Sequence, residues 1–235
     1  DDVLLLGSMV EKAIDRATCA VIVEPVQGEG GVNLAQKDFL QALRRFCDEN
    51  DALLIFDEVQ CGLGRTGYLW TYQYYQVQPD IMALAKPLGG GLPIGAVLVT
   101  DRVAEVIGPG DHGSTFAANP LICHVAQVVF NRINNEAFLV AVRDKGEYLR
   151  ARLEALQAEG APIEEIRGRG LMWGLQTTVP AAEVVAAGYE EGIIVASAGE
   201  NVVRLVPPLI VEMEHIDLFI ERLRTVFSKI EADTN

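Results

Sequence analysis

The sequence has few side chains that could hold a metal ion or cross-link a fold. Its 235 residues include three histidines and four cysteines. Cys19, Cys47, Cys61 and Cys123 are scattered, with neither CxxC nor CxxH spacing, so neither a zinc site nor a disulfide framework is indicated. Reduced thiols in a cytoplasmic protein are the simplest interpretation, and we therefore expect a cytoplasmic location.

Positive charge and long apolar runs are also scarce. Nineteen Lys and Arg face 33 Asp and Glu, giving a formal net charge of −14, which argues against non-specific binding to nucleic acid or anionic membranes. No apolar run reaches the roughly 20 residues of a membrane-spanning helix, and no basic segment followed by an apolar one opens the chain. Half of the residues are hydrophobic, enough to pack the core of one large or two small domains.

Short apolar runs at Ala20–Val23, Leu53–Phe56 and Ile81–Ala85 are too short for helices and suit buried strands. Lys37–Asn50 is an amphipathic helix between the first two runs. This β–α–β order predicts an α/β fold with a mostly parallel sheet. Apolar spacing also predicts a helix over residues 7–18.

A change of composition near Asn131–Glu136 marks the expected boundary between two domains. Before it, we expect a strand over 94–100 and a helix over Leu121–Ile133. The division predicts a large domain over 1–135 and a small C-terminal α+β domain over 136–235. The elements expected in the small domain are a helix over 142–157, a loop over 160–170, a strand over 171–177, a helix over 181–190, a strand over 192–197 and a helix over 214–231.

Two predicted strands end in opposite charges. The first delivers Asp57, and the second delivers Lys86 followed by the glycines 89–91. Ligands bind at the carboxyl ends of parallel strands, and a partly desolvated lysine is a nucleophile that can form an imine. A lysine of this kind, with an acid that keeps a pyridine nitrogen protonated, is what pyridoxal phosphate requires. A buried Asp–Lys salt bridge beside a tight turn explains the two residues equally well.

The motifs around these residues resemble a known family. FDEVQCGLGRTG (residues 56–67) is followed, 29 positions after its aspartate, by the lysine of LAKPLGGGLPIGA (residues 84–96). This order resembles the class III (ornithine-type) aminotransferases, which are fold-type I pyridoxal-phosphate enzymes, and among them the acetylornithine type. The resemblance covers nearly the whole chain. Pro87 departs from the small residue usual after the lysine, which leaves the identity of the lysine unaffected.

The resemblance implies a role for each residue around the ring of pyridoxal phosphate. Lys86 forms the bond to the cofactor, Asp57 pairs with the pyridine nitrogen, Val59 packs on the ring face and Gln60 bonds the phenolic oxygen. In an extended segment Asp57 and Val59 would share one face, with Glu58 pointing the other way as a structural acid.

A third motif, GST at residues 113–115, precedes a helix expected to start near Asn119-Pro120. Its hydroxyl and N–H groups suit a phosphate, and a plain N-capping turn is the rival interpretation. The resemblance implies that Ser114 and Thr115 bind the phosphate of a cofactor held by the neighbouring subunit, and therefore that the protein is a homodimer. His112 is a lone loop histidine.

Arg204 interrupts the apolar run Val202–Val206 and needs an anionic partner, which any local carboxylate could supply. The resemblance implies that Arg204 binds a substrate carboxylate through its planar fork and pairs with Glu29 when a different substrate is bound. From its residues alone the VEPVQGEGGV segment is a solvated loop, and the resemblance adds Glu24 to the scaffold of the cofactor site. Arg65 is expected to order its loop.

The implied reaction is transfer of the terminal amino group of N-acetylornithine to 2-oxoglutarate, giving a semialdehyde and glutamate in arginine biosynthesis. Succinylornithine, ornithine or 4-aminobutyrate would use the same core residues.

Members of the family are typically much longer, so we expect that an N-terminal portion is missing. In the family that portion supplies a phosphate-binding loop and a stacked ring. A non-catalytic, truncated or split homologue that acts as an interaction module is therefore the rival hypothesis. A nicotinamide-dependent oxidoreductase is disfavoured, because no GxGxxG motif follows a strand and opens a helix.

Overall fold

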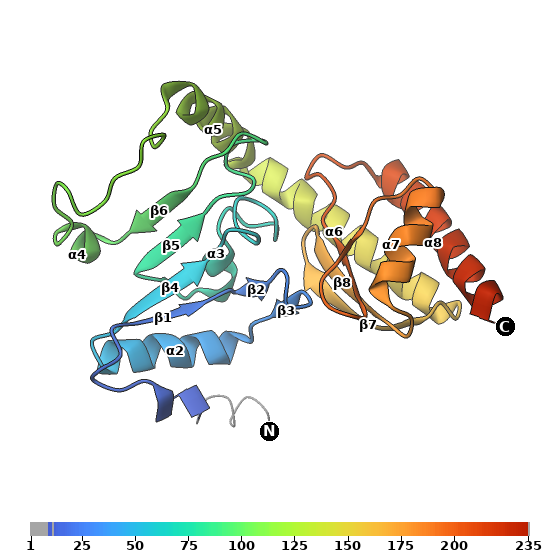
Figure 1. Ribbon diagram of the computed structural model, residues 1–235, viewed down its shortest axis with the longest axis horizontal. Helices are drawn as coiled ribbons and strands as arrows, with labels where there is room; N and C mark the ends of the chain where they lie inside the picture. Colours follow the sequence, from blue (N-terminus) through green and yellow to red (C-terminus); the bar gives the residue numbers. More distant parts are fainter. Residues whose placement is uncertain (1–8, 11, 235) are drawn as a thin grey trace. The chain divides into compact units, whose positions relative to one another are not determined.

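The computed structural model describes residues 9, 10 and 12–234, which form two compact units (Figure 1). The first contains the described residues up to Pro25, then Ala35–Leu63 and Tyr68–Asn135. The second contains Val26–Leu34, Gly64–Gly67 and the described residues from Glu136 onward. The segments Val26–Leu34 and Gly64–Gly67 thus belong to the second unit although they precede residue 136 in the chain. The division into domains at 135/136 stays a prediction. No helix among the described residues is long and apolar enough to cross a membrane.

The first unit is built on a four-stranded sheet in the order β1 (Ala20–Val23), β4 (Leu53–Asp57), β5 (Ile81–Leu84) and β6 (Ala96–Val99). The pairs β1–β4 and β4–β5 are parallel, whereas β6 runs antiparallel to β5. The short β5–β6 connection explains the change of direction, since a parallel return needs a longer crossover, usually a helix. The predicted α/β fold with a mostly parallel sheet is confirmed.

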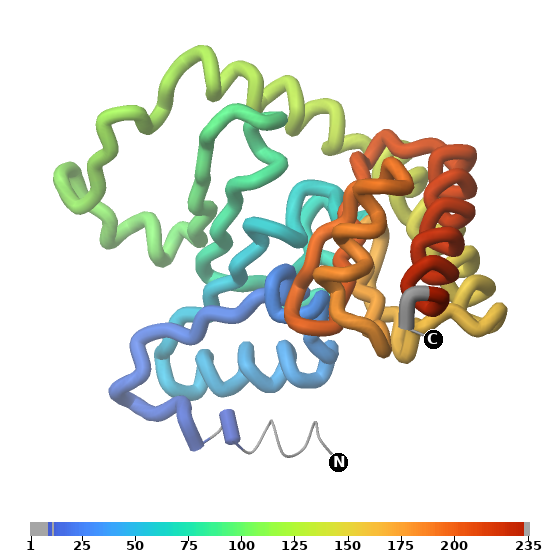
Figure 2. The backbone as a smooth tube through the Cα atoms, turned by 45° about the vertical axis from the view of Figure 1, so that its right-hand side comes forward, coloured from blue at the N-terminus to red at the C-terminus, as the bar shows by residue number. Residues whose placement is uncertain are grey.

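Helix α2 (Lys37–Glu49) covers one face of this sheet and runs alongside β1 and β4 (Figures 1 and 2). Its apolar side buries Leu40, Leu43, Phe46 and Cys47, which share a core with residues of β4. The helix lies in the βαβ crossover, as the alternation of apolar runs predicts. Of the helix expected over 7–18, Met9, Val10, Lys12 and Ala13 are helical, residues 7, 8 and 11 lie outside the described residues, and a turn follows at 16–17.

The first unit also contains three helices that follow β4 in the chain. They are α3 (Thr71–Tyr75), α4 (Asp101–Ala104) and α5 (Pro120–Ile133). The Asn119 side chain caps α5, accepting hydrogen bonds from the N–H groups of Leu121 at 3.1 Å and Ile122 at 3.3 Å. The helix therefore begins where the Asn-Pro pair predicts. Tyr75, the last residue of α3, is buried and donates from its hydroxyl to Pro25 O at 3.2 Å.

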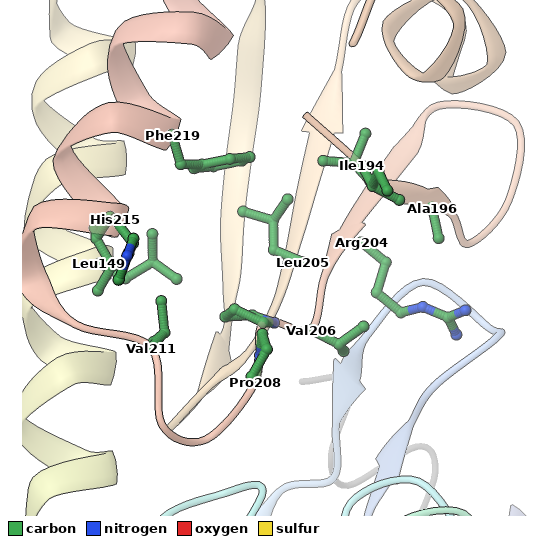
Figure 3. Close-up of a pocket in the computed structure, with 13 residues that line it drawn as sticks. Leu149, Ile194, Ala196, Arg204, Leu205, Val206, Pro208, Val211, His215 and Phe219 are labelled. Carbon is green, nitrogen blue, oxygen red and sulfur yellow. The ribbon is translucent and has the colours of Figure 1, made fainter. Parts of the chain in front are cut away.

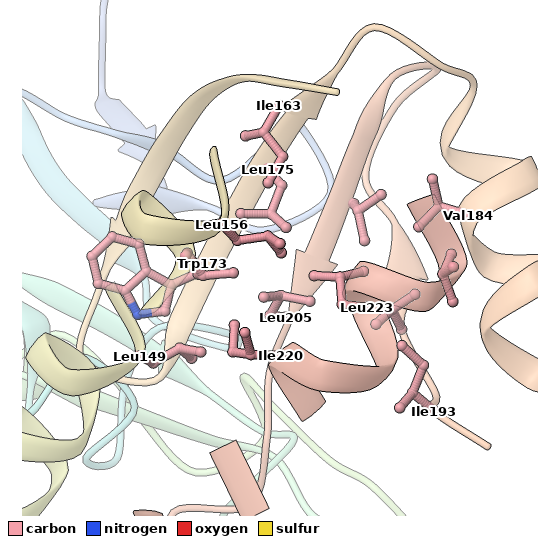
Figure 4. Packing of buried hydrophobic residues seen from close by; sticks show 14 of the residues in the cluster. Leu149, Leu156, Ile163, Trp173, Leu175, Val184, Ile193, Leu205, Ile220 and Leu223 are labelled. Atoms are coloured by element: carbon pink, nitrogen blue, oxygen red, sulfur yellow. The ribbon is translucent and has the colours of Figure 1, made fainter. Parts of the chain in front are cut away.

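The second unit contains an antiparallel sheet in the order β7 (Ile163–Arg169), β8 (Met172–Thr177), β10 (Val202–Leu205) and β9 (Ala196–Ser197). A separate two-stranded ladder joins β2 (Val26–Gln27) to β3 (Asn33–Leu34). Helices α6 (Glu136–Ala158), α7 (Ala181–Glu190) and α8 (Met213–Thr234) pack against the larger sheet through buried side chains such as Leu156, Leu175 and Leu223 (Figure 4). The α+β prediction for the C-terminal residues is confirmed.

Several expected boundaries in this unit are wrong. The expected loop 160–170 contains strand β7, whose charged residues Glu164 and Glu165 are exposed and mask the apolar alternation, as is common at a sheet edge. Only Ala196 and Ser197 of the expected strand 192–197 pair with β10. Helix α6 starts at Glu136, six residues before the expected 142. The residues 137–142 are all apolar, so the charged face that identifies this helix begins only at Arg143.

Candidate active site

Asp57 and Lys86 follow neighbouring parallel strands of the first unit. Asp57 is the last residue of β4 and pairs in register with Ala83 of β5, and Lys86 follows the end of β5 at Leu84 by two residues. Asp57 is half-buried and Lys86 is exposed. Because β4 and β5 are parallel, both side chains lie at the carboxyl ends of the strands, and ligands bind at these ends in open α/β folds. Glu24, which follows parallel strand β1, belongs to this edge as well.

The chain turns immediately after Asp57. The Asp57 carboxylate accepts a hydrogen bond from Val59 N at Oδ1 (2.9 Å), and Glu58 O accepts one from Gly62 N at 2.9 Å. The expectation that Asp57 and Val59 share one face of an extended segment is therefore wrong, since Val59 and Gln60 lie in a turn. An aspartate side chain readily bonds the backbone N–H two residues ahead, which competes with a continued strand. The same bond fixes the orientation of the Asp57 carboxylate.

Glu58 is a structural acid, as expected. Its side chain is buried, with the residue 1 % exposed, and accepts hydrogen bonds from Thr71 N at 2.7 Å and Tyr72 N at 2.8 Å, the first two residues of α3. Burial raises the pKa of the Glu58 carboxyl to about 7, and the hydrogen bonds from Thr71 and Tyr72 oppose part of that rise.

This raised pKa predicts a pH-dependent stability. Between the ordinary pKa of 4.5 and about 7, the folded state binds the Glu58 proton more tightly than the unfolded state, so raising the pH lowers the free energy of unfolding. The full effect is about 3 kcal/mol, lost as the pH rises through that window and absent in Glu58→Gln. Denaturant unfolding of both full-length apoproteins from pH 5 to 8 measures it. Parallel curves for the two proteins would contradict the assignment.

The segment after Lys86 is a series of tight turns that needs its glycines. Leu88 N donates to Ala85 O at 2.7 Å, and Leu92 N donates to Gly89 O at 3.0 Å. A Cβ on Gly89 would lie 2.2 Å from Leu92 O, so a larger residue cannot occupy that position without moving the backbone. The glycine cluster thus shapes the turn that presents Lys86.

Ser114 and Thr115 lie in the open loop between α4 and α5, drawn in green in Figure 2, and both are exposed. The rival interpretation of GST as a capping turn is wrong, because Asn119 caps α5. His112 is also exposed in this loop. Phosphate binding by Ser114 and Thr115 in a neighbouring subunit stays a prediction.

Arg204 and Glu29 form an ion pair within the second unit. Arg204 Nη1, on β10, lies 2.8 Å from Glu29 Oε1 and also donates to Gly28 O at 2.8 Å. The Arg204 side chain is 13 % exposed, whereas that of Glu29 is 67 % exposed, so the carboxylate can move into solvent. In Figure 3 the guanidinium points away from an apolar cavity of about 310 Å³ that its own stem lines with Val206 and Phe219.

Two further arginines hold segments of the second unit through backbone carbonyl groups. Arg65 Nη1 donates to Leu171 O at 2.9 Å and to Pro207 O at 2.6 Å, and these two hydrogen bonds agree with its expected ordering role. Burial lowers the pKa of Arg65 to about 10. Arg167 donates from Nε to Gly31 O at 2.7 Å. The Glu29 loop is therefore held at Gly28 by Arg204 and at Gly31 by Arg167. Sequence reasoning missed Arg167, which carries no signal in an expected loop.

A carboxylate and an amine at the carboxyl ends of paired parallel strands are the two groups that a pyridoxal-phosphate enzyme needs. The sequence profile of the family described as Aminotransferase class-III matches residues 5–227, and the chain belongs to that family. The cofactor of the family is pyridoxal phosphate, and the residues present fit it, with an acid fixed by Val59 N and an exposed amine beside a glycine turn.

Relatives and solved structures agree with this family. The chain is 53 % identical over 203 residues to the mitochondrial acetylornithine aminotransferase of Alnus glutinosa, covering 86 % of this chain and 45 % of that protein. It is 45 % identical over 222 residues to the acetylornithine aminotransferase of Methanocaldococcus jannaschii, covering 94 % and 56 %. The chain thus spans about half the length of the curated relatives it matches.

Among solved structures, N-acetylornithine aminotransferase from Stenotrophomonas maltophilia matches with a TM-score of 0.89 and 35 % identity, over 97 % of this chain and 61 % of that one. Ornithine aminotransferase from Toxoplasma gondii matches with a TM-score of 0.90 and 35 % identity, over 97 % and 55 %. These structures have the same fold as the described residues.

Proposed function

We propose that the complete protein is a pyridoxal-phosphate aminotransferase that transfers the terminal amino group of N-acetylornithine to 2-oxoglutarate, in arginine biosynthesis. The observation that carries the reaction type is the placement of Asp57 and Lys86 at the carboxyl ends of paired parallel strands. The substrate is supported by relatives from plants and archaea that are named acetylornithine aminotransferases. A cytoplasmic location is supported by Cys19, Cys47, Cys61 and Cys123, which form no disulfide among the described residues.

The chain's own residues would divide the chemistry between them. When bound, pyridoxal phosphate supplies an electron sink for the substrate carbanion. Lys86 Nζ would hold the cofactor covalently and, once displaced by the amino substrate, would move the proton at the reacting carbon. Asp57, oriented by Val59 N at 2.9 Å, would keep the pyridine nitrogen protonated. Val59 would pack on the ring, and Gln60 would bond its phenolic oxygen.

A homodimer is part of this proposal. Ser114 and Thr115 would bind the phosphate of the cofactor in the neighbouring subunit. Phe116 beside them is 85 % exposed, and Leu121 and Val128 of α5 are exposed apolar residues that follow in sequence. Large exposed apolar side chains of this kind support a subunit interface at this segment.

Arg204 is proposed to bind the α-carboxylate of glutamate after release from Glu29. Arg204→Lys should raise the apparent KM for glutamate by at least about tenfold with a smaller change in kcat, because an ammonium cannot form the bidentate fork. Steady-state kinetics of the full-length enzyme measure both constants. Arg152→Lys is the matched control, since Arg152 pairs with Asp217 at 2.8 Å on the surface of the same unit. An unchanged KM for glutamate would remove this role.

The substrate assignment is tested by half-reactions of the full-length holoenzyme. N-Acetylornithine, succinylornithine, ornithine and 4-aminobutyrate are each mixed with the enzyme, and loss of the visible absorption band is followed in time. The highest second-order rate constant is expected for N-acetylornithine. A preference for 4-aminobutyrate would remove the arginine-pathway assignment, and a full-length protein that takes up no cofactor would favour the non-catalytic interaction module.

A further inference from the structure

Glu58 lies between the residues proposed to contact the cofactor and is bonded on both sides. Its backbone N–H donates to Ala83 O of β5 at 3.0 Å, which extends the β4–β5 ladder by one residue beyond Asp57. Its side-chain oxygens accept the N–H groups of Thr71 and Tyr72 at 2.7 and 2.8 Å. The residue therefore joins the end of the sheet to the start of α3.

The turn 58–62 is closed against α3 by further contacts. Thr71 Oγ1 donates to Cys61 O at 2.7 Å, and Gly62 N donates to Glu58 O at 2.9 Å. A Cβ on Gly62 would lie 2.8 Å from Glu58 O and 3.0 Å from Glu58 Oε2, so the turn is packed directly onto the carboxylate. Val59 and Gln60 lie inside this closed turn, and Asp57 directly precedes it.

Glu58 also lines a void beside the segment that carries the lysine. It lines a narrow void, too small for a water molecule, together with Ala85, Pro87 and Leu88. Ala85 and Pro87 are the two neighbours of Lys86 in the chain. Glu58 thus directly follows the proposed pyridine partner and lines the same void as the chain neighbours of the proposed imine-forming lysine.

We propose that Glu58 is a positioning residue of the cofactor site, which fixes the turn that follows Asp57 and carries Val59 and Gln60. This inference rests on the proposed function. The N–H groups of Thr71 and Tyr72 point in directions that helix α3 fixes. By accepting both, the Glu58 carboxylate holds the turn 58–62 in one conformation. Sites of this kind need groups held to within a fraction of an ångström, and a misplacement of about 1 Å can cost about 100-fold in rate.

The test compares three variants of the full-length protein. Glu58→Gln places an amide N–H₂ group opposite one of the two N–H donors, Glu58→Asp keeps the charge on a shorter stem, and Asp80→Asn is the control. Asp80 is a half-buried carboxylate on the same sheet that accepts Leu54 N at 2.8 Å and Arg44 Nη1 at 2.7 Å, at the amino end of β5. It matches Glu58 in kind while lying at the opposite edge of the parallel strands.

Three quantities are measured for each protein: the melting temperature of the apoprotein, the dissociation constant of pyridoxal phosphate by absorbance titration, and the pH at which the visible band changes. Glu58→Gln is expected to weaken cofactor binding at least about tenfold, equivalent to about 1.4 kcal/mol, and to shift the pH midpoint of the band. Asp80→Asn is expected to lower the melting temperature with cofactor affinity within about twofold of wild type. Glu58→Asp should recover part of the affinity.

Cofactor affinity and a band midpoint equal to those of wild type in Glu58→Gln would overturn the inference, as would equal losses in Glu58→Gln and Asp80→Asn. If Glu58→Gln does not fold, the comparison of Glu58→Asp with Asp80→Asn decides by the same criteria. A wild-type protein that binds no pyridoxal phosphate would instead overturn the proposed function on which the inference rests.

Discussion

Lys86→Ala is expected to remove the visible absorption band of the full-length enzyme and to lower kcat for amino transfer by at least about 10³-fold. The side chain is the proposed covalent attachment point and the group that moves the proton, and general acid–base catalysis alone contributes about 10²–10⁴-fold. Lys86→Arg should give the same result, because a guanidinium stays protonated and cannot form an imine. Absorbance spectra and steady-state kinetics on the same preparations measure both effects.

Lys37→Ala is the matched control for this prediction. Lys37 belongs to the same unit, begins α2 and donates to Gln76 Oε1 at 2.9 Å on the surface. It should keep the band and the activity. Retention of the band in Lys86→Ala, or its loss in Lys37→Ala, would contradict the assignment of the lysine.

Asp57→Asn is expected to lower kcat by about 10²–10³-fold, the range seen when one group that stabilises transition-state charge is removed. An amide oxygen can still accept the Val59 N–H, so the turn should persist and the loss should come from the missing charge. The cofactor ring nitrogen would lose its proton, and the ring would become a weaker electron sink.

Asp57→Glu and Asp80→Asn separate this effect from general damage to the sheet. Asp57→Glu keeps the charge and should retain more activity than Asp57→Asn. Asp80→Asn removes a carboxylate from the other edge of the sheet and should leave kcat near wild type. Activity of Asp57→Asn within a few-fold of wild type would show that this carboxylate does not hold the ring nitrogen.

The parts of the fold that could be predicted are those set by local sequence. Strands β4 and β5 are short apolar runs that end in a charge, and α2 between β1 and β4 has one apolar side. Once β4 and β5 are parallel, Asp57 and Lys86 must start from one sheet edge, so their neighbourhood follows from the order of elements. The start of α5 follows from Asn119 and Pro120 in the same way.

The parts that could not be predicted depend on partners far away in the chain. Strand β7 has the sequence IEEIRGR, whose charged residues are typical of a loop. It is a strand because it pairs with β8. Arg167 holds Gly31 O across 136 positions, and Arg204 finds Glu29 across 175. The turn at Val59 is local, but a strand and an Asp-centred turn compete there, and the alternation pattern favours the strand.

The central claim is that Lys86 binds the cofactor whose ring Asp57 holds. Borohydride reduction of the loaded full-length protein, followed by peptide mass mapping, tests it most directly. The phosphopyridoxyl mass is expected on the peptide that contains Lys86, and it should be absent there in Lys86→Ala. The label on any other lysine, or no label in protein that has taken up the cofactor, would contradict it.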